Sequence, residues 1–239
     1  MSRSVRPPSF RSLRERLDAS IERQDAGLAL DAHALVEATD VLDLAFRPIR
    51  ERVKASAVDV QGVLNVALLH MIRGLNGSDR AQVRADGDAA TALYVVVHLV
   101  QPEMVAPQVR DGVTRALAEG APQRLDGAAV WAVEYHSVVL REVWDRVQGR
   151  PLADAYLKSR QLAVALAPAG IPGMDGLLKE LAEAHVLHYD QSGALNDLDA
   201  AAAALEQALA ITDDPERATM LKLALTAVQN ARPTSSGQR

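Results

Sequence analysis

Six histidines are the side chains of this sequence best suited to acid–base or metal chemistry. His185 and His188 lie three residues apart on one face of an expected helix, and such a pair can supply two metal ligands. No third ligand follows at a matching spacing, so we expect no metal site and no cofactor. His185 also falls in the apolar stripe of its helix, which favours a hydrogen-bonded histidine packed between helices.

The only aromatic-rich cluster of the sequence lies within residues 131–144. It contains Glu134 and His136, but residues two apart point to different faces of a helix and make a poor acid–base pair. Trp, Tyr and Arg are the side chains that most often anchor a binding surface, so this helix could line a groove. The alternative is that Trp131 and Trp144 pack inside the protein.

A third group of polar residues lies on two expected helices of the N-terminal half. His70 and Arg73 share a helix face, and His98 follows Tyr94 by about one turn. Stacked helices would bring them to one concave surface, whereas the alternative is scattered polar residues between helices. The candidates for lining a binding groove are His70, Arg73, Tyr94, His98, Trp131, Tyr135, His136, Arg141, His185, His188 and Tyr189.

Motifs of known catalytic chemistry are missing. The sequence has no Gly-x-Ser-x-Gly elbow, no phosphate-binding glycine loop and no His-Glu-x-x-His. It also has no cysteine, which excludes disulfides, thiolate metal sites and a cysteine nucleophile. We therefore assign no catalytic residue and favour a binding protein over an enzyme.

Composition predicts an all-α protein. Of the 239 residues 49% are hydrophobic but only 3% are aromatic, so the core must consist mainly of Ala, Leu and Val. The net charge is −5 although residues 1–23 hold six arginines, so the body is acidic and we expect no nucleic-acid binding. No apolar segment reaches about 18 residues, so we expect no membrane span and a cytoplasmic protein.

Helical periodicity divides the chain into hairpins. Apolar residues recur every three or four positions between clusters of Gly, Pro and Asn, and Asp214 before Pro215 reads as a helix N-cap. Residues 1–8 and 232–239 are expected to be disordered. The expected helices are 9–23, 27–46, 59–75, 88–101, 105–118, 126–148, 152–167, 174–192, 195–212 and 216–231.

Pairs of these helices span about 35–45 residues, the period of helical solenoids. In residues 195–212, Leu205 is flanked by Ala201 and Ala208, the small-large-small order of a second tetratricopeptide helix. We therefore predict an antiparallel helix-hairpin array, a tetratricopeptide-like right-handed solenoid of about ten helices. A single helical domain over 9–231 would combine degenerate repeats in 9–168 with the clearest repeat in 174–231.

The segment 181–230 also resembles a known family. It contains His-Tyr-Asp-Gln-Ser-Gly at 188–193 and Asp-Leu-Asp-Ala-Ala at 197–201. This is similar to the tetratricopeptide-like repeats of actinobacterial proteins that often carry a CHAT (caspase-like) protease domain. The likeness covers most of 59–231 and is strongest in 181–217. The His–Cys dyad of that protease is absent because the sequence has no cysteine, so the resemblance implies only the repeat scaffold.

Three functions follow as hypotheses. The first is a non-catalytic scaffold, monomeric or weakly dimeric, whose concave groove binds a protein or peptide and regulates a separately encoded effector. The second is a small-molecule-binding protein or biosynthetic enzyme with a pocket inside the array. The third is a regulatory module of a DNA-bound complex that uses the basic arm. A closed cavity that collects two or more of His70, His98, His136 and His185 would favour the second.

Overall fold

The computed structural model describes residues 12–53 and 57–232. These ranges form α-helices and contain no strand, which confirms the all-α prediction. Apart from Arg232, the ends expected to be disordered lie outside the described residues. The helices are α1 (Leu13–Glu22), α2 (Gly27–Leu30), α3 (Ala32–Ala45), α4 (Arg47–Arg50), α5 (Val60–Asn76), α6 (Arg80–Val100), α7 (Pro107–Ala118), α8 (Leu125–Val147), α9 (Arg150–Leu166), α10 (Met174–Ser192), α11 (Leu195–Ile211) and α12 (Pro215–Asn230).

Most helix ends follow the sequence prediction, and local capping explains them. Asp214 accepts hydrogen bonds from the backbone N–H groups of Glu216 and Arg217, which confirms it as the N-cap of α12. Gly193, at φ +70°, donates its N–H to the Tyr189 carbonyl and ends α10 in the left-handed conformation that glycine adopts without strain.

Two helix predictions were wrong. The single helix expected over 27–46 is divided at Asp31, whose side chain accepts from His33 N and starts α3 as an N-cap. The helix expected to begin at residue 88 begins at Arg80, because Asp79 caps it by accepting from Ala81 N. The first turns of α6 carry too few apolar residues to show a periodic stripe.

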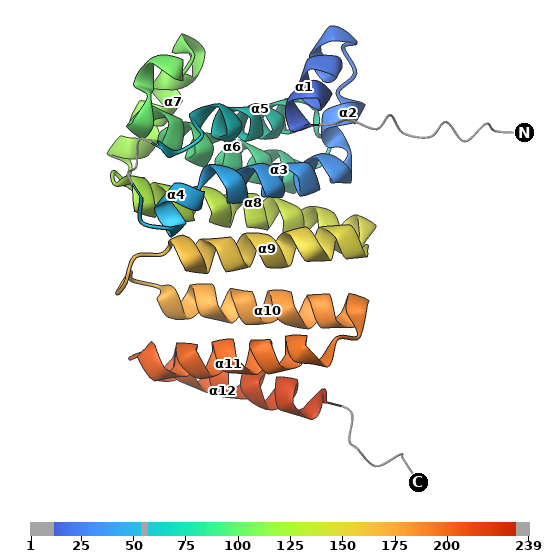
Figure 1. The fold of residues 1–239 in the computed structure, drawn as a ribbon, viewed down its shortest axis with the longest axis vertical. Helices are drawn as coiled ribbons and strands as arrows, with labels where there is room; N and C mark the ends of the chain where they lie inside the picture. The colour runs from blue at the N-terminus through green and yellow to red at the C-terminus, as the bar shows by residue number, and fades with distance from the viewer. Residues whose placement is uncertain (1–11, 54–56, 233–239) are drawn as a thin grey trace, which may run out of the picture.

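From α5 onward, helices that follow one another along the chain pack side by side. The pairs α5–α6, α8–α9, α9–α10, α10–α11 and α11–α12 are all in contact, and Figure 1 shows them stacked along the long axis of the molecule. Helix α7 is an exception, since it contacts α6 and projects from the stack, with α8 taking the next place. None of the helices of the described ranges is long and apolar enough to cross a membrane.

Helix α3 breaks this sequential order. It packs against α5 on one side and α9 on the other, and it also touches α8 (Figure 1). Its contact face is apolar, with Leu35, Ala38 and Leu42 fully buried. A helix from the N-terminal part of the chain therefore fills a position in the stack between two helices that are far apart in sequence.

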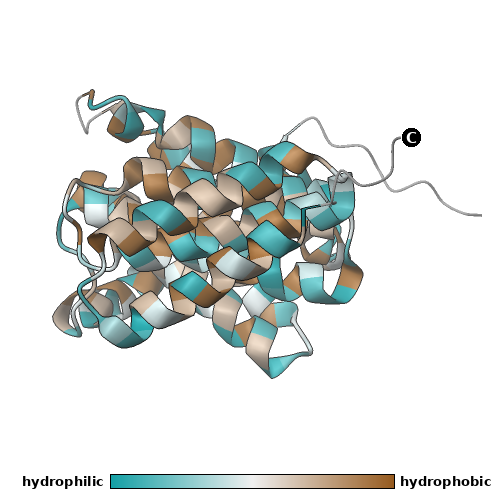
Figure 2. Cartoon of the chain, turned by 90° about the horizontal axis from the view of Figure 1, so that it is seen from below, coloured by the Kyte–Doolittle hydropathy of each residue, from teal (hydrophilic) through white to brown (hydrophobic). Residues whose placement is uncertain are grey.

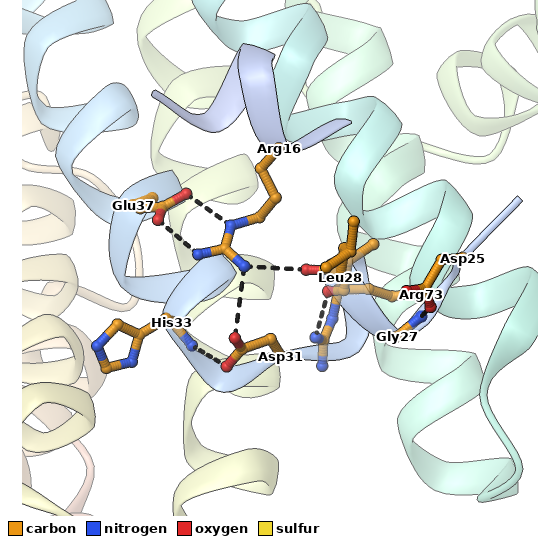
Figure 3. A network of polar contacts seen from close by, with 9 residues as sticks. Arg16, Asp25, Gly27, Leu28, Asp31, His33, Glu37 and Arg73 are labelled. Atoms are coloured by element: carbon orange, nitrogen blue, oxygen red, sulfur yellow. Dashed lines mark hydrogen bonds and ion pairs between the residues drawn. The ribbon is translucent and has the colours of Figure 1, made fainter. Parts of the chain in front are cut away.

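Two arginines hold the short helix α2 in place (Figure 3). Arg16 donates to the Leu28 carbonyl and Arg73 donates to the Ala29 carbonyl, so each caps a backbone oxygen at the end of α2. Arg16 also forms a two-bond ion pair with Glu37 of α3 at 2.9 and 2.7 Å. The N-terminal helices are thereby tied to α3 and α5 by charge as well as by packing.

The buried apolar residues form two clusters that meet at α10. Leu177 and Ala184 belong to the larger cluster, which extends from α1 to α10, whereas Leu178 and Ala182 belong to the smaller one with α11 and α12. Seen from the α12 end, hydrophobic and hydrophilic residues alternate around the helices (Figure 2). The C-terminal hairpin thus joins the rest of the protein mainly through α10.

Candidate binding groove

One face of α8 carries a row of side chains that stay accessible. Trp131, Tyr135, Val138 and Arg141 are spaced by four, three and three residues, so they project in one direction from the helix. Three concavities follow this row from α6 to α12. We call the three together the groove.

The first concavity lies between α6, the end of α7 and α8. Trp131 and Tyr135 form one wall, Asp88 and Thr91 of α6 form another, and Glu119 closes it after α7. It contains two carboxylates, and none of the described residues lining it is a cation.

The second concavity lies between α8 and α10, with α9 beneath. Arg160 of α9 is almost fully buried there and pairs with Glu134 of α8 at 3.5 Å and with Glu180 of α10. Its guanidinium also lies over the Tyr156 ring, 5.3 Å from the centroid. Burial, reinforced by the charge of Glu180, raises the pKa of the Glu134 carboxyl, and Arg160 offsets this only in part.

The third concavity is mostly apolar and lies between α10, α11 and α12. Its floor includes Ala182, Leu205 and Val228, and its volume is about 460 Å³. Arg141 and Lys179 stand at its edge, and each is paired within its own helix, with Asp145 and Glu183 respectively. Small alanines of α12 leave the space open.

Trp131 and Tyr135 join the first two concavities. Their rings meet edge to face at 85°, with centroids 5.3 Å apart. Within the described residues neither Trp131 Nε1 nor Tyr135 Oη has a hydrogen-bond partner, so both polar tips remain available to a ligand. Val138 follows one turn later with 41% of its surface exposed. An accessible aromatic pair beside an exposed aliphatic residue is typical of a protein-binding surface.

Three of the residues predicted to line a groove are buried in the core instead. His70, Arg73 and His136 are each 0% exposed and lie in the core. Helical periodicity had placed them only at the edge of the apolar stripe. They form a chain of polar contacts that also includes Asp86 and Thr39. Helices α3, α5, α6 and α8 each contribute at least one member of this buried histidine chain.

The distances along the buried histidine chain are those of hydrogen bonds. His70 Nδ1 lies 2.7 Å from Asp86 Oδ1, His70 Nε2 lies 2.9 Å from His136 Nδ1, and His136 Nε2 lies 2.9 Å from Thr39 Oγ1. Arg73 Nε donates to the same Asp86 oxygen at 3.1 Å. Burial lowers the pKa of both histidines, that of His136 well below 6.5. Burial therefore favours the neutral form of both imidazoles.

A hydroxyl, two imidazoles and a carboxylate in line resemble the arrangement that activates a nucleophile. Here Thr39 is only 1% exposed, and its hydroxyl also lies 2.9 Å from the Leu35 carbonyl oxygen of its own helix. No substrate can reach a hydroxyl that is sealed inside the core. We therefore interpret the buried histidine chain as a structural network that fixes how four helices meet.

His185 and His188 lie together as the sequence predicted, but they are hydrogen-bonded to carboxylates. Both donate to Asp197 of α11, at 3.0 and 2.6 Å, and His188 also reaches Asp154 of α9 at 2.8 Å. Burial opposes the charged form of His188, but its two carboxylate partners outweigh this and raise its pKa. Among the described residues no group of three or more His, Asp and Glu side chains could hold a metal ion.

The remaining candidates are separate from one another. Tyr94 is buried, with its hydroxyl 3.9 Å from Met71 Sδ, and burial raises its pKa. Tyr189 packs against the smaller apolar cluster, and His98 lies at the end of α6 with a buried Nδ1. Of the eleven candidates only Trp131, Tyr135 and Arg141 line the groove.

Sequence reasoning missed the carboxylates that bind the histidines and the charged floor of the groove. Asp86 lies in the first turns of α6, which were expected to be a loop, so its place on the buried face could not be seen. Arg160 was hidden in a helix with no other signal. A charged residue in an otherwise apolar stripe is the signal that could have found both.

No protein-family model matches this chain, and neither the curated proteins nor the solved structures include a match. The function is therefore inferred from the geometry of the groove.

Proposed function

We propose that the protein is a non-catalytic scaffold of tetratricopeptide-like character that binds a protein or peptide partner in the groove. The observation that supports this most strongly is the accessible Trp131–Tyr135 pair, whose polar tips have no hydrogen-bond partner among the described residues. Aromatic residues with an apolar body and a polar tip are enriched at the centres of protein interfaces.

The arrangement of the C-terminal helices supports the same proposal. Helices α8, α10 and α12 contribute the accessible side chains, whereas α9 and α11 lie between them and contribute Arg160 and Leu205 to the floor. An alternation of lining and supporting helices is the way in which helical repeats build an extended binding surface. Regulation of a separately encoded effector is an extension of this proposal.

A small-molecule enzyme is less well supported. His70 and His136 touch each other, but both are fully buried and neither lines a space that a ligand could enter. None of the five concavities described on the surface of residues 12–53 and 57–232 is lined by a histidine. The groove offers carboxylates, aromatic rings and cations that are already paired with carboxylates, which suit recognition better than proton transfer.

Site-specific photocrosslinking tests the proposal. A photoreactive amino acid at position 138 should crosslink a polypeptide in the native cell extract, and Trp131→Ala should abolish that crosslink. Leu223→Ala is the matched control, because Leu223 of α12 is 68% exposed and lies outside the groove. Crosslinking that survives Trp131→Ala, or native mass spectrometry that finds a bound small molecule and no polypeptide, would contradict the scaffold.

A further inference from the structure

The end of the groove around Trp131 and Tyr135 carries an excess of negative charge. Asp88 and Glu119 line the first concavity, and Glu134 and Glu180 line the second. Arg160 is the one cation among the described residues that line these two spaces, and it is already held by Glu134 and Glu180. Four carboxylates against one guanidinium leave three negative charges around an accessible aromatic pair.

This charge is poorly compensated by nearby residues. Glu119 has no ion pair within the described part of the chain. Asp88 has only Arg84, at 3.9 Å and with both side chains exposed, which is a weak interaction in water. Burial and the charge of Glu180 raise the pKa of the Glu134 carboxyl. A ligand cation placed beside Glu134 would oppose this effect and favour the charged carboxylate.

The aromatic pair also attracts cations, as the carboxylates do. The face of an indole or phenol ring carries negative charge density and attracts an ammonium or a guanidinium. Arginine stacking on aromatic rings already occurs twice on this part of the molecule. Arg160 lies over Tyr156 at 5.3 Å, and Arg141 lies over Trp144 at 5.5 Å. Trp131 and Tyr135 have carboxylates around them, but within residues 12–53 and 57–232 no cation lies over their rings.

The other end of the groove has a different character. Arg141 and Lys179 are each neutralised by a carboxylate of their own helix, and the floor between them is alanine, leucine and valine. The groove therefore changes from acidic and aromatic beside α6 and α7 to neutral and aliphatic beside α12. A ligand that complements both ends must itself change from cationic to aliphatic along its length.

We infer that the groove receives a segment of a partner protein that places an arginine or lysine at Trp131 and Tyr135 and aliphatic side chains between α10 and α12. This inference rests on the proposed function. It adds which types of side chain the ligand carries and in which direction the ligand lies along the groove. An acidic partner would meet uncompensated repulsion at Asp88 and Glu119, and a nucleic acid would meet it along the whole first half of the groove.

Selection of peptides from a random display library against the full chain tests the inference. We expect enriched sequences that combine Arg or Lys with aliphatic residues and that are lost on Trp131→Ala. An enriched peptide is then synthesised with its arginine or with citrulline, which keeps the shape and removes the charge. Fluorescence anisotropy should show the arginine form binding roughly three- to thirtyfold more tightly to the wild type.

Two variants distinguish the effect of the groove carboxylates on binding from the effect of the overall negative charge of the protein. Asp88→Asn combined with Glu119→Gln removes two carboxylates whose one ion pair in the described part of the chain is the exposed Asp88–Arg84 contact. It should weaken binding of the arginine peptide by about two- to fivefold per carboxylate. Glu142→Gln is the matched control, since Glu142 lies on α8 outside the groove and pairs with Arg146. It should leave the affinity unchanged.

The outcomes distinguish the inference from the proposed function. Enrichment of neutral or acidic peptides that still require Trp131 would overturn the inference and leave the scaffold standing. Basic peptides that bind equally well to the Trp131→Ala and Asp88→Asn/Glu119→Gln proteins would overturn it as nonspecific attraction. If no peptide is enriched over a display control, both the inference and the proposed function fail.

Discussion

His70 Nε2 lies 2.9 Å from His136 Nδ1, and this contact determines where the protons of the buried histidine chain lie. The single proton of the Thr39 hydroxyl can point to the Leu35 carbonyl or to His136 Nε2, each 2.9 Å away. If it points to His136 Nε2, then His136 Nδ1–H donates to His70 Nε2 and His70 Nδ1–H donates to Asp86. Both imidazoles are then neutral, and each contact from Thr39 through His136 and His70 to Asp86 has one proton. The opposite direction would leave His70 Nδ1 facing Asp86 without a proton, so we assign the first.

Removal of one imidazole should be costly because its neighbours cannot reach water. We expect His136→Ala to lower the free energy of unfolding by about 2–4 kcal/mol, since it leaves a cavity and deprives Thr39 and His70 of a partner. Urea denaturation followed by circular dichroism measures this. His33→Ala is the control, because His33 is exposed, and it should change stability by less than about 0.5 kcal/mol. A similarly small effect for His136→Ala would show that the buried histidine chain does not stabilise the fold.

The buried histidines should make the protein less stable as the pH falls. In the unfolded chain both titrate near 6.5, whereas burial lowers both pKa values in the folded state. Below about pH 6.5 the unfolded state therefore binds more protons, and each histidine lowers the free energy of unfolding by up to about 1.4 kcal/mol per pH unit. Urea titrations between about pH 5 and 8 test this in the His188→Gln protein, because His188 has a pH dependence of the opposite sign and is absent from that variant. Stability that stays constant or rises on acidification of that variant would refute the prediction.

His188 should act in the opposite sense. Its folded pKa is raised above 6.5 by Asp197 and Asp154, so its contribution is fully present below 6.5 and is lost as the pH rises through the folded pKa. We expect His188→Gln to destabilise the protein by about 1 kcal/mol below pH 6.5 and by little at alkaline pH. Thermal unfolding at paired pH values measures the difference, with His33→Gln as the control. An equal loss at both pH values would indicate lost packing and no charge interaction.

The last helix should depend on its N-cap. Asp214 satisfies two backbone N–H groups of α12, which packs on α11 and buries only Leu221 and Val228 deeply. Asp214→Ala should cost about 1 kcal/mol and speed amide hydrogen exchange in α12 more than elsewhere. Asp213→Ala changes the neighbouring carboxylate, which caps nothing, and should leave the exchange pattern of the wild type. Identical exchange in the two variants would show that packing alone holds α12.

Much of the helical structure could be predicted from the sequence because its signals are local. The breakers at Gly149 and Gly193 and the cap at Asp214 each act within a few residues, and the helices around them end close to the predicted positions. The start of α6 was missed because its first turns are polar on most sides. The place of α3 between α5 and α9 has no local signal, since it depends on contacts such as that of Asp40 with Lys158, 118 residues apart.

The side chains of the groove were predictable only in part, for the same reason. Trp131, Tyr135 and Arg141 lie on one helix, and their common direction follows from helical spacing. The charged floor unites Glu134, Arg160 and Glu180 from three different helices, and it exists only once those helices have packed. Periodicity also could not distinguish a histidine at the edge of an apolar stripe from one inside the core, which is where His70 and His136 lie.

The position of α3 has a consequence for the order in which the chain can fold. During synthesis residues 32–45 leave the ribosome long before residues 150–166, which supply one of the two helices that α3 packs against. The apolar face of α3 therefore remains partly exposed while more than a hundred further residues are synthesised. Completion of the N-terminal half is thus tied to the arrival of α9, whereas α10, α11 and α12 can each be added to a neighbour that is already in place.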